Sequence, residues 1–488
     1  MSGNNAGPIR VRFAPSPTGF LHVGGARTAI YNDLLRQRLG GAFVLRIEDT
    51  DRARSDEAMI QQICQGLEWA GIPWDEGPIL QSAGVERHRA AARRLLDEGK
   101  AYPCFRTREE LDAARAEKEK ERVIFRYREV FEPPSEEEAK RRIDAGEPFV
   151  VRFRMPAGPV AFHDLVRGDV EFPEETQDDF ILLRSDGSPT YHLSVVCDDI
   201  EMEITHVIRG EDHLSNTPKH VPLFRALGGQ VPVFAHLPLI LGSDKKRLSK
   251  RTGATSVEEF RDQGLLPQAL YNALALLGWS PGEDREILTR DEMVELFSTE
   301  RLNSSAAVFD RDKLAWLNAH YMNQVSFEEI LERVQPFLEA QGLAGFEGDK
   351  LERLHRVLAL HRSRAKTLVE LAEMAPAYFA EEQTYEVERC GKFLKQPQLP
   401  AWLETLKARY GAAKSFDLET LEAILRELAT EVEVKAGVLI HPVRMALTAT
   451  KAGPPLFDVV EVMGREATER HLANFIAFLQ RHAVEAEG

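Results

Sequence analysis

Cysteine is scarce in this sequence, and long apolar runs are missing from it. The 488 residues include four cysteines, which stand far apart: Cys64, Cys104, Cys197 and Cys390. In a chain of this size they predict reduced thiols and no disulfide framework. No apolar run approaches the roughly 20 residues needed to cross a bilayer, and the N-terminus has no apolar signal segment. We therefore expect a cytoplasmic protein with no membrane partner.

Basic residues are also fewer than acidic ones. The chain has 62 Lys and Arg against 78 Asp and Glu, which gives a formal net charge of −16. Binding to nucleic acid depends largely on neutralising phosphates, so an acidic balance argues against a polyanionic partner. The field that matters is local to the binding face, however, and the net charge leaves the partner open. The length is too great for one compact core and predicts two to four domains.

The N-terminal pattern predicts a strand, a turn, a helix and a second strand. Residues 9–14 (IRVRFA) predict the first strand, PSPTG predicts a turn, and the following helix is expected to stop at Gly40 and Gly41. Residues 42–51 (AFVLRIEDTD) predict a buried strand with carboxylates at its exit. This is a βαβ unit, which indicates a parallel α/β domain.

The later chain changes character twice. Residues 101–189 alternate charged helical stretches with short strands and predict an inserted α+β subdomain. Residues 188–200 and 204–214 resume a buried-strand pattern, and from about residue 255 the pattern is nearly all helical. We expect a Rossmann-like α/β domain formed by residues 1–100 and 190–245 and split by the insertion. Two helical regions, 246–325 and 326–488, should follow.

Two loops carry candidate anion sites. Gly24 and Gly25 stand at a predicted helix N-terminus, where unpaired N–H groups and the helix dipole attract anions, and His22 can donate a hydrogen bond to a phosphate. The alternative is a tight turn with a capping histidine. The second loop, residues 245–251 (KKRLSKR), packs five cations around one serine. Alone it could equally be a solvated basic turn or a nucleic-acid patch.

Together the two loops resemble those of a known enzyme family. RFAPSPTG followed by HVGGART, with RLSKR later in the chain, is similar to the signatures of class I aminoacyl-tRNA synthetases, in their bacterial-type glutamyl branch. The resemblance implies ATP-dependent activation of L-glutamate, release of pyrophosphate, and transfer to the 3'-terminal adenosine of tRNA(Glu), with tRNA(Gln) as a second acceptor left open. Residues 101–189 would then bind the acceptor end, 246–325 the stem and 326–488 the anticodon. A monomer is expected.

The resemblance also implies site residues. A pocket for glutamate needs arginines for two carboxylates and an acid for the ammonium. The implied glutamate-binding residues are Arg12, Ala14, Ser16, Glu48, Tyr191, Val195 and Arg209. The implied ATP-binding residues are His22, Gly24, Gly25, Asp212, Ile240, Arg247, Ser249 and Lys250, and of these His22, Gly24, Gly25 and Lys250 would be catalytic. Mg²⁺ would accompany the ATP. By themselves, Glu48 could be a solvated loop end and Tyr191 a core tyrosine.

A zinc site of the kind many bacterial members carry is not expected here. Cys104 is present, but Arg106 stands two positions on, and residues 122–130 supply neither cysteine nor histidine. One thiolate cannot make a four-coordinate structural zinc site, so no bound metal is predicted and Cys104 should be an ordinary buried thiol.

The helical tail contains a run without acidic residues, 353–366, inside an acidic chain. It is either the solvated face of an amphipathic helix or a tRNA contact, and the resemblance favours the second. The candidate tRNA-binding residues are Arg353, Arg356, Arg362, Arg364 and Lys366. His355 and His361 could add charge at lower pH. The helical tail argues against a glutamyl-Q-tRNA(Asp) or glutaminyl-tRNA synthetase, and the two intact loops argue against a non-catalytic module.

Overall fold

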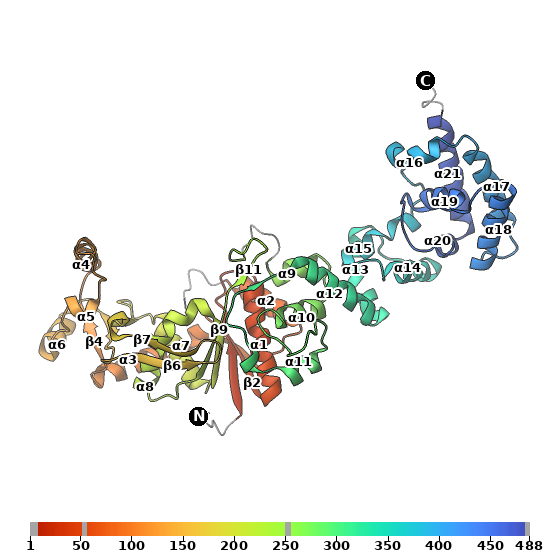
Figure 1. The fold of residues 1–488 in the computed structure, drawn as a ribbon. Coiled ribbons are helices and arrows are strands. Elements are labelled where there is room, and N and C mark those ends of the chain that lie inside the picture. The colour runs from red at the N-terminus through yellow and green to blue at the C-terminus, as the bar shows by residue number, and fades with distance from the viewer. Residues whose placement is uncertain (1–7, 51–55, 249–254, 484–488) are drawn as a thin grey trace. The chain divides into compact units, whose positions relative to one another are not determined.

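A computed structural model describes residues 8–50, 56–248 and 255–483 of the chain (Figure 1). The chain divides into two compact units. The first comprises Met1–Arg261 and Pro267–Leu314, and the second comprises Asp262–Leu266 and Ala315–Gly488. Among the described residues, no helix is both long and apolar enough to cross a membrane.

A seven-stranded sheet forms the centre of the first unit. Its strands, in spatial order, are β3 (Glu76–Leu80), β2 (Gly41–Ile47), β1 (Ile9–Phe13), β9 (His206–Gly210), β10 (Val233–Leu237), β6 (Val160–Asp164) and β7 (Gly168–Phe172). All neighbouring pairs are parallel except β6 with β7. Most residues of β1, β2 and β9 are buried, as expected for parallel strands covered on both faces. The predicted βαβ unit is confirmed, with α1 (Val23–Leu39) ending before Gly40, whose φ is 73°.

One element differs in type from the sequence-based prediction. Residues within 188–200, predicted as a strand, form the helix α7 (Tyr191–Glu201). Val195 and Val196 are buried in it, and so are Asp198 and Asp199. Because this helix is buried on several sides, its sequence carries no polar face, and a short apolar run of that kind does not distinguish a strand from a helix. The other helices near the sheet are α2 (Glu57–Trp69), α3 (Val85–Asp97) and α8 (Thr217–Ala226).

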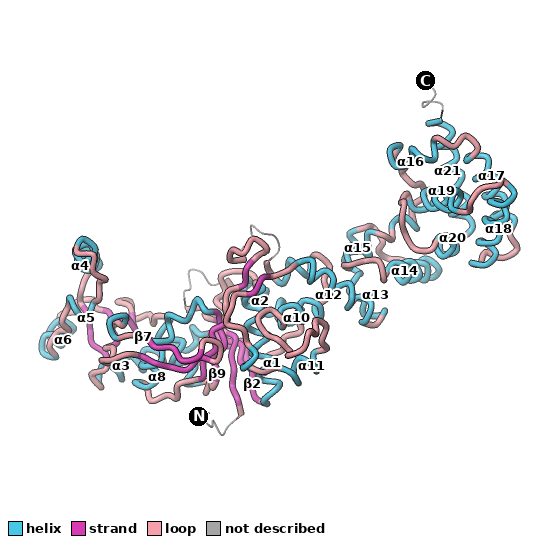
Figure 2. The backbone as a smooth tube through the Cα atoms, in the orientation of Figure 1, coloured by secondary structure: helices cyan, strands magenta, loops and turns pink. Residues whose placement is uncertain are grey.

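The segment 101–189 contributes to two different sheets. Strands β4 (Ala101–Cys104), β5 (Val150–Phe153) and β8 (Phe180–Leu183) form a separate antiparallel sheet, beside helices α4 (Arg108–Lys120), α5 (Tyr127–Val130) and α6 (Glu136–Asp144). Strands β6 and β7 instead extend the seven-stranded sheet past β10 (Figure 2). In the small sheet, the buried Cys104 Sγ lies 3.1 Å from the Tyr127 hydroxyl. The insertion thus places Asp164, at the end of β6, against β10 of the main sheet.

The remaining chain is mostly helical, as predicted (Figure 2). It begins with β11 (Ile240–Leu241), α9 (Val257–Asp262), α10 (Pro267–Ala275), α11 (Arg290–Leu296), β12 (Ala307–Val308) and α12 (Arg311–Gln324). It continues with α13 (Phe327–Ala340), α14 (Gly348–His361), α15 (Leu368–Glu373), α16 (Val387–Leu394), α17 (Leu399–Ala412), α18 (Leu418–Glu431), α19 (Gly437–Thr448), α20 (Leu456–Met463) and α21 (Arg465–Ala483). Side-chain caps begin several of them, such as Ser326 for α13 and Asp417 for α18.

Candidate active site

A cavity of about 630 Å³ lies in the first unit, where the loops after β1, β2, β9 and β10 meet. This is the carboxyl edge of the parallel strands, the usual ligand position in open α/β sheets. Twelve of the residues that the sequence analysis singled out line it: Arg12, Ala14, Ser16, His22, Gly24, Gly25, Glu48, Tyr191, Arg209, Asp212, Ile240 and Arg247. Val195 does not, because α7 turns its side chain into the hydrophobic core. Ser249 and Lys250 lie outside the described residues.

His22 is the N-cap of α1. Its Nδ1 accepts hydrogen bonds from the backbone N–H groups of Gly24, at 3.1 Å, and of Gly25, at 3.3 Å. Since Nδ1 is an acceptor, the proton of the neutral ring is on Nε2, which is therefore a donor. His22 keeps exposed surface, but partial desolvation by the surrounding cavity wall, and then the nearby Arg247 guanidinium, lower its pKa, so the ring is neutral near pH 7.

The first turn of α1 differs in one respect from the expectation of unpaired N–H groups. The Val23 N–H donates to the Thr255 carbonyl at 2.9 Å, and the Ala26 N–H donates to the His22 carbonyl at 3.0 Å. Together with the two bonds to His22 Nδ1, these satisfy the first backbone donors of the helix. The two interpretations of His22, a helix cap and an anion site, are therefore compatible. The cap uses Nδ1, and Nε2–H remains available to an anion.

The residues after the second basic loop pair with the first loop. His22 and Ser256 form an antiparallel bridge, and the Val257 N–H donates to the Leu21 carbonyl at 2.8 Å. On the other side, the Leu248 N–H donates to the Ile240 carbonyl at 3.0 Å. Leu248 and Thr255, which flank residues 249–254, both line the cavity. The two loops singled out in the sequence are thus anchored at the same cavity.

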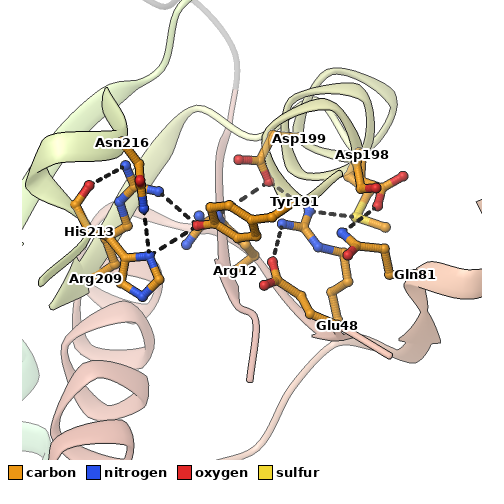
Figure 3. Close-up of polar contacts among 12 residues, drawn as sticks. Arg12, Glu48, Gln81, Tyr191, Asp198, Asp199, Arg209, His213 and Asn216 are labelled. Carbon is orange, nitrogen blue, oxygen red and sulfur yellow. Dashed lines mark hydrogen bonds and ion pairs between the residues drawn. The ribbon is translucent and has the colours of Figure 1, made fainter. Parts of the chain in front are cut away.

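A buried chain of ion pairs lies along another wall (Figure 3). Asp199 Oδ1 is 3.3 Å from Arg12 Nε and 2.6 Å from Arg46 Nη1, and Arg46 Nη2 is 3.3 Å from Glu48 Oε1. Burial raises the pKa of Glu48, although the neighbouring Arg46 and Arg12 guanidinium groups oppose this. Asp199 thus links two arginines, one of which lines the cavity.

Sequence reasoning missed Arg46 and Asp199. A signal was available for Arg46, because an arginine inside an apolar strand is costly unless it is paired, and Arg46 stands inside AFVLRI. The same argument applies to Arg209, which stands inside HVIRG. Asp199 was hidden because its segment was interpreted as a strand.

Arg209 is held on several sides. Its Nε donates to His236 Nε2 at 3.1 Å, and Nη2 donates to Thr217 Oγ1 at 2.8 Å and to the His213 carbonyl at 3.2 Å. Its Nη1 donates to the Tyr191 hydroxyl at 3.4 Å, and Tyr191 lies between Arg209 and the group formed by Asp199 and Glu48 (Figure 3). Burial, and then the Glu48 charge, raise the pKa of Tyr191 to about 12, so its hydroxyl stays protonated. Tyr191 is therefore a polar wall of the cavity.

The basic run of the second unit contains two kinds of residue. Arg353 and Arg362 are half-buried and donate to main-chain carbonyls, Arg353 to Tyr378 and Arg362 to Met322 and Val325. These bonds satisfy main-chain carbonyls within the unit, so they explain both arginines without a bound ligand.

The other three cations of this run face solvent. Arg356 is paired with Glu461 at 2.7 Å, while Arg364 and Lys366 are exposed. His361 is bonded to the Tyr378 hydroxyl at 2.8 Å, and burial lowers its pKa to about 4. His361 therefore gains charge only well below neutral pH.

Comparisons with known proteins agree with this geometry. Residues 8–316 match the family described as "tRNA synthetases class I (E and Q), catalytic domain", and residues 329–476 match "Anticodon binding domain". A glutamate–tRNA ligase of Geobacter sulfurreducens is 46% identical over 474 residues, which are 97% of this chain and 99% of the relative. Glutamate–tRNA ligase 1 of Caldanaerobacter subterraneus is 42% identical over 475 residues, 97% of this chain and 98% of the relative.

A solved structure agrees as well. The crystal structure of a glutamate tRNA ligase from Elizabethkingia meningosepticum, in complex with its amino acid, superposes with a TM-score of 0.88 at 32% identity. The match covers 97% of this chain and all of that one. The parallel sheet with a cavity at its strand ends and the helical second unit agree with these matches, and this chain belongs to the class I aminoacyl-tRNA synthetases of the glutamate and glutamine family.

Proposed function

We propose that this chain is a glutamate–tRNA ligase whose cavity joins L-glutamate to the α-phosphate of ATP. The observation that carries the proposal is the presence of two buried arginines, Arg12 and Arg209, and one largely buried acid, Glu48, on the wall of one cavity. Glutamate has two carboxylates and one ammonium, so this charge set is its complement. Ser16 and Tyr191, also on the wall, add hydroxyl groups for orientation.

ATP would lie at the His22 end of the cavity. His22 is neutral, with Nε2–H free of the cap, so it can donate to a phosphate oxygen without titrating. Arg247 and Asp212 line the same cavity. Mg²⁺ binds oxygen ligands, most of them supplied by phosphates and water. The Asp212 carboxylate would be a suitable protein ligand for it. When bound, the ion neutralises phosphate charge.

The reaction needs alignment and charge stabilisation more than a base. A substrate carboxylate oxygen attacks the α-phosphorus, and the bond to the pyrophosphate oxygen breaks. His22 would stabilise charge that develops on the phosphate oxygens. Lys250 is proposed as the cation that meets the triphosphate, because the flanking residues Leu248 and Thr255 are both on the cavity wall. In the second step the 3'-terminal adenosine hydroxyl attacks the acyl carbon and AMP leaves.

The remaining assignments follow the same proposal. Residues 101–189 would contact the acceptor end, 246–325 the stem and 326–488 the anticodon of tRNA(Glu), within a monomeric cytoplasmic enzyme. Of the three exposed basic candidates, Arg356 is already paired with Glu461, so Arg364 and Lys366 suit RNA contact best. A ligand role for Arg353 and Arg362 would first require their carbonyl partners to be given up.

One assay tests the function directly. The purified chain is incubated with labelled glutamate, ATP and total tRNA, and the charged acceptor is identified. Glutamate on tRNA(Glu) is expected, and failure to charge any tRNA with glutamate would overturn the proposal. Separate reactions with purified tRNA(Glu) and tRNA(Gln) then decide whether the second acceptor is used.

A further inference from the structure

Asp164 and His236 form a fully buried pair behind the cavity. Both side chains are 0% exposed. Asp164 ends β6, in the inserted segment, and His236 lies on the adjacent β10. Asp164 Oδ2 is 2.6 Å from His236 Nδ1, while Oδ1 accepts from the backbone N–H groups of Val166 and Arg167, each at 2.9 Å. Burial alone would raise the pKa of Asp164, but the hydrogen bonds from His236 and the backbone hold it below its usual value.

These contacts fix the tautomer of His236. Its Nε2 faces Arg209 Nε at 3.1 Å and Thr217 Oγ1 at 3.0 Å. A guanidinium can only donate, so Nε2 must be unprotonated, and the ring proton is on Nδ1, directed at the Asp164 carboxylate. Burial also lowers the pKa of His236, which keeps the ring neutral. The carboxylate thus makes Nε2 an acceptor aimed at Arg209.

The same contacts set the orientation of the Arg209 guanidinium. Thr217 Oγ1 accepts from Arg209 Nη2 at 2.8 Å and lies beside His236 Nε2, so the three side chains close a triangle. The edge of the guanidinium formed by Nε and Nη2 is therefore held by protein. Nη1 is the nitrogen left to meet a ligand beside the Tyr191 hydroxyl. Arg209 lines the cavity, whereas Asp164, Thr217 and His236 do not.

We infer that Asp164 and His236, with Thr217, are positioning residues that hold Arg209 in the orientation required to bind a substrate carboxylate. The inference rests on the proposed role of Arg209 and extends it to a strand of the inserted segment. The insertion then does more than cover the acceptor end: β6 supplies the carboxylate that decides which ring nitrogen of His236 can accept.

The test is a set of variants of the full chain, assayed by aminoacylation of tRNA(Glu) with glutamate, ATP and tRNA varied in turn. In Asp164→Asn, the amide donates to His236 Nδ1 and the ring proton moves to Nε2. Two N–H groups, of His236 Nε2 and Arg209 Nε, then face each other and repel. Thr217→Val keeps shape but removes the hydroxyl. We expect both to raise the KM for glutamate roughly tenfold or more, with the KM for ATP and for tRNA within about twofold of wild type. Thr217→Ser, which restores the hydroxyl, should recover most of the loss.

The chain offers a matched control between β6 and β7, its other neighbour in the sheet. Asp169 and His163 make an equivalent contact on β7 and β6, 2.7 Å long, but their side chains are 96% and 63% exposed. Asp169→Asn should leave all three KM values unchanged. Unfolding midpoints of all variants are measured in parallel. If Asp164→Asn does not fold, the Thr217→Val and Thr217→Ser pair decides the question.

Arg209→Ala separates failure of this inference from failure of the proposed function. If Arg209→Ala raises the KM for glutamate but Asp164→Asn and Thr217→Val do not, the positioning role is wrong. The role is equally wrong if the KM values for all three substrates rise together with a lower unfolding midpoint, because that is the signature of a structural contact alone. If Arg209→Ala itself leaves the KM for glutamate unchanged, the proposed pocket is wrong.

Discussion

Arg46 Nη1 lies 2.6 Å from Asp199 Oδ1, and neither side chain is more than 4% exposed. Neither residue was singled out by its sequence pattern. The pair joins β2, which leads to Glu48, to α7, which begins at Tyr191. Because Asp199 also contacts Arg12, one buried carboxylate connects the proposed carboxylate-binding and ammonium-binding parts of the cavity. Its charge is therefore expected to matter both for folding and for glutamate binding.

Asp199→Asn should be strongly destabilising. The change removes the buried negative charge that Arg12 and Arg46 share. Removing one partner of a buried ion pair costs about 3 kcal/mol or more. Denaturant unfolding of the two proteins measures this. Glu201→Gln, at the exposed end of the same helix, is the control and should unfold like wild type. Equal stabilities of Asp199→Asn and wild type would show that the network contributes little.

The two functions of His22 can be separated by substitution. Asparagine is a good N-cap and can replace Nδ1 as acceptor for Gly24 and Gly25, but it places no donor where Nε2–H stands. We expect His22→Asn to retain the unfolding midpoint and to lose about a hundredfold in kcat. His22→Ala should lose activity and also about 1 kcal/mol of stability. A fully active His22→Asn enzyme would remove Nε2 from the reaction.

Glutamate binding should weaken as the pH is lowered. Burial raises the pKa of Glu48, so its carboxylate is protonated at a higher pH than an ordinary glutamate, and the protonated acid no longer attracts the substrate ammonium. The KM for glutamate is measured from about pH 8 down to about pH 5.5, above the range where the substrate carboxylates titrate. The KM should rise toward acid. In Glu48→Gln it should be high throughout and nearly flat; a slope equal to that of wild type would assign the titration to another group.

The basic run in the second unit should divide into RNA contacts and structural contacts. Replacing Arg364 and Lys366 together by alanine should raise the KM for tRNA(Glu) and reduce its salt dependence, with no change in unfolding midpoint. Arg362→Met should lower the unfolding midpoint and leave the KM for tRNA(Glu) unchanged. It leaves the Met322 and Val325 carbonyls without their donor, which costs about 1 to 3 kcal/mol. Aminoacylation at several salt concentrations and thermal unfolding measure the two effects. An Arg362→Met protein with wild-type stability and weakened tRNA binding would reverse the assignment.

Local patterns in the sequence were enough for much of the fold and the cavity. A strand, a Gly-containing turn and a helix are set by neighbours in the chain, so the βαβ unit and the N-cap position of His22 could be predicted. Arg209 could be singled out because a charge inside an apolar strand must find a partner or a ligand. The type of α7 could not, since burial on several sides removes the periodicity that identifies a helix.

The sequence by itself determined which candidate groups the chain carries: a helix start after His22, arginines and an acid suited to glutamate, and a basic second loop. Only the tertiary structure decided how these groups are held. Asp199 with Arg46, and Asp164 with His236, are brought together from positions more than 70 residues apart. The role of each pair depends on contacts of a few ångströms between buried groups. One contact pairs two charges, and the other fixes the tautomer of a histidine. No spacing along the chain encodes such distances, because they arise when strands and helices from distant segments pack against one another.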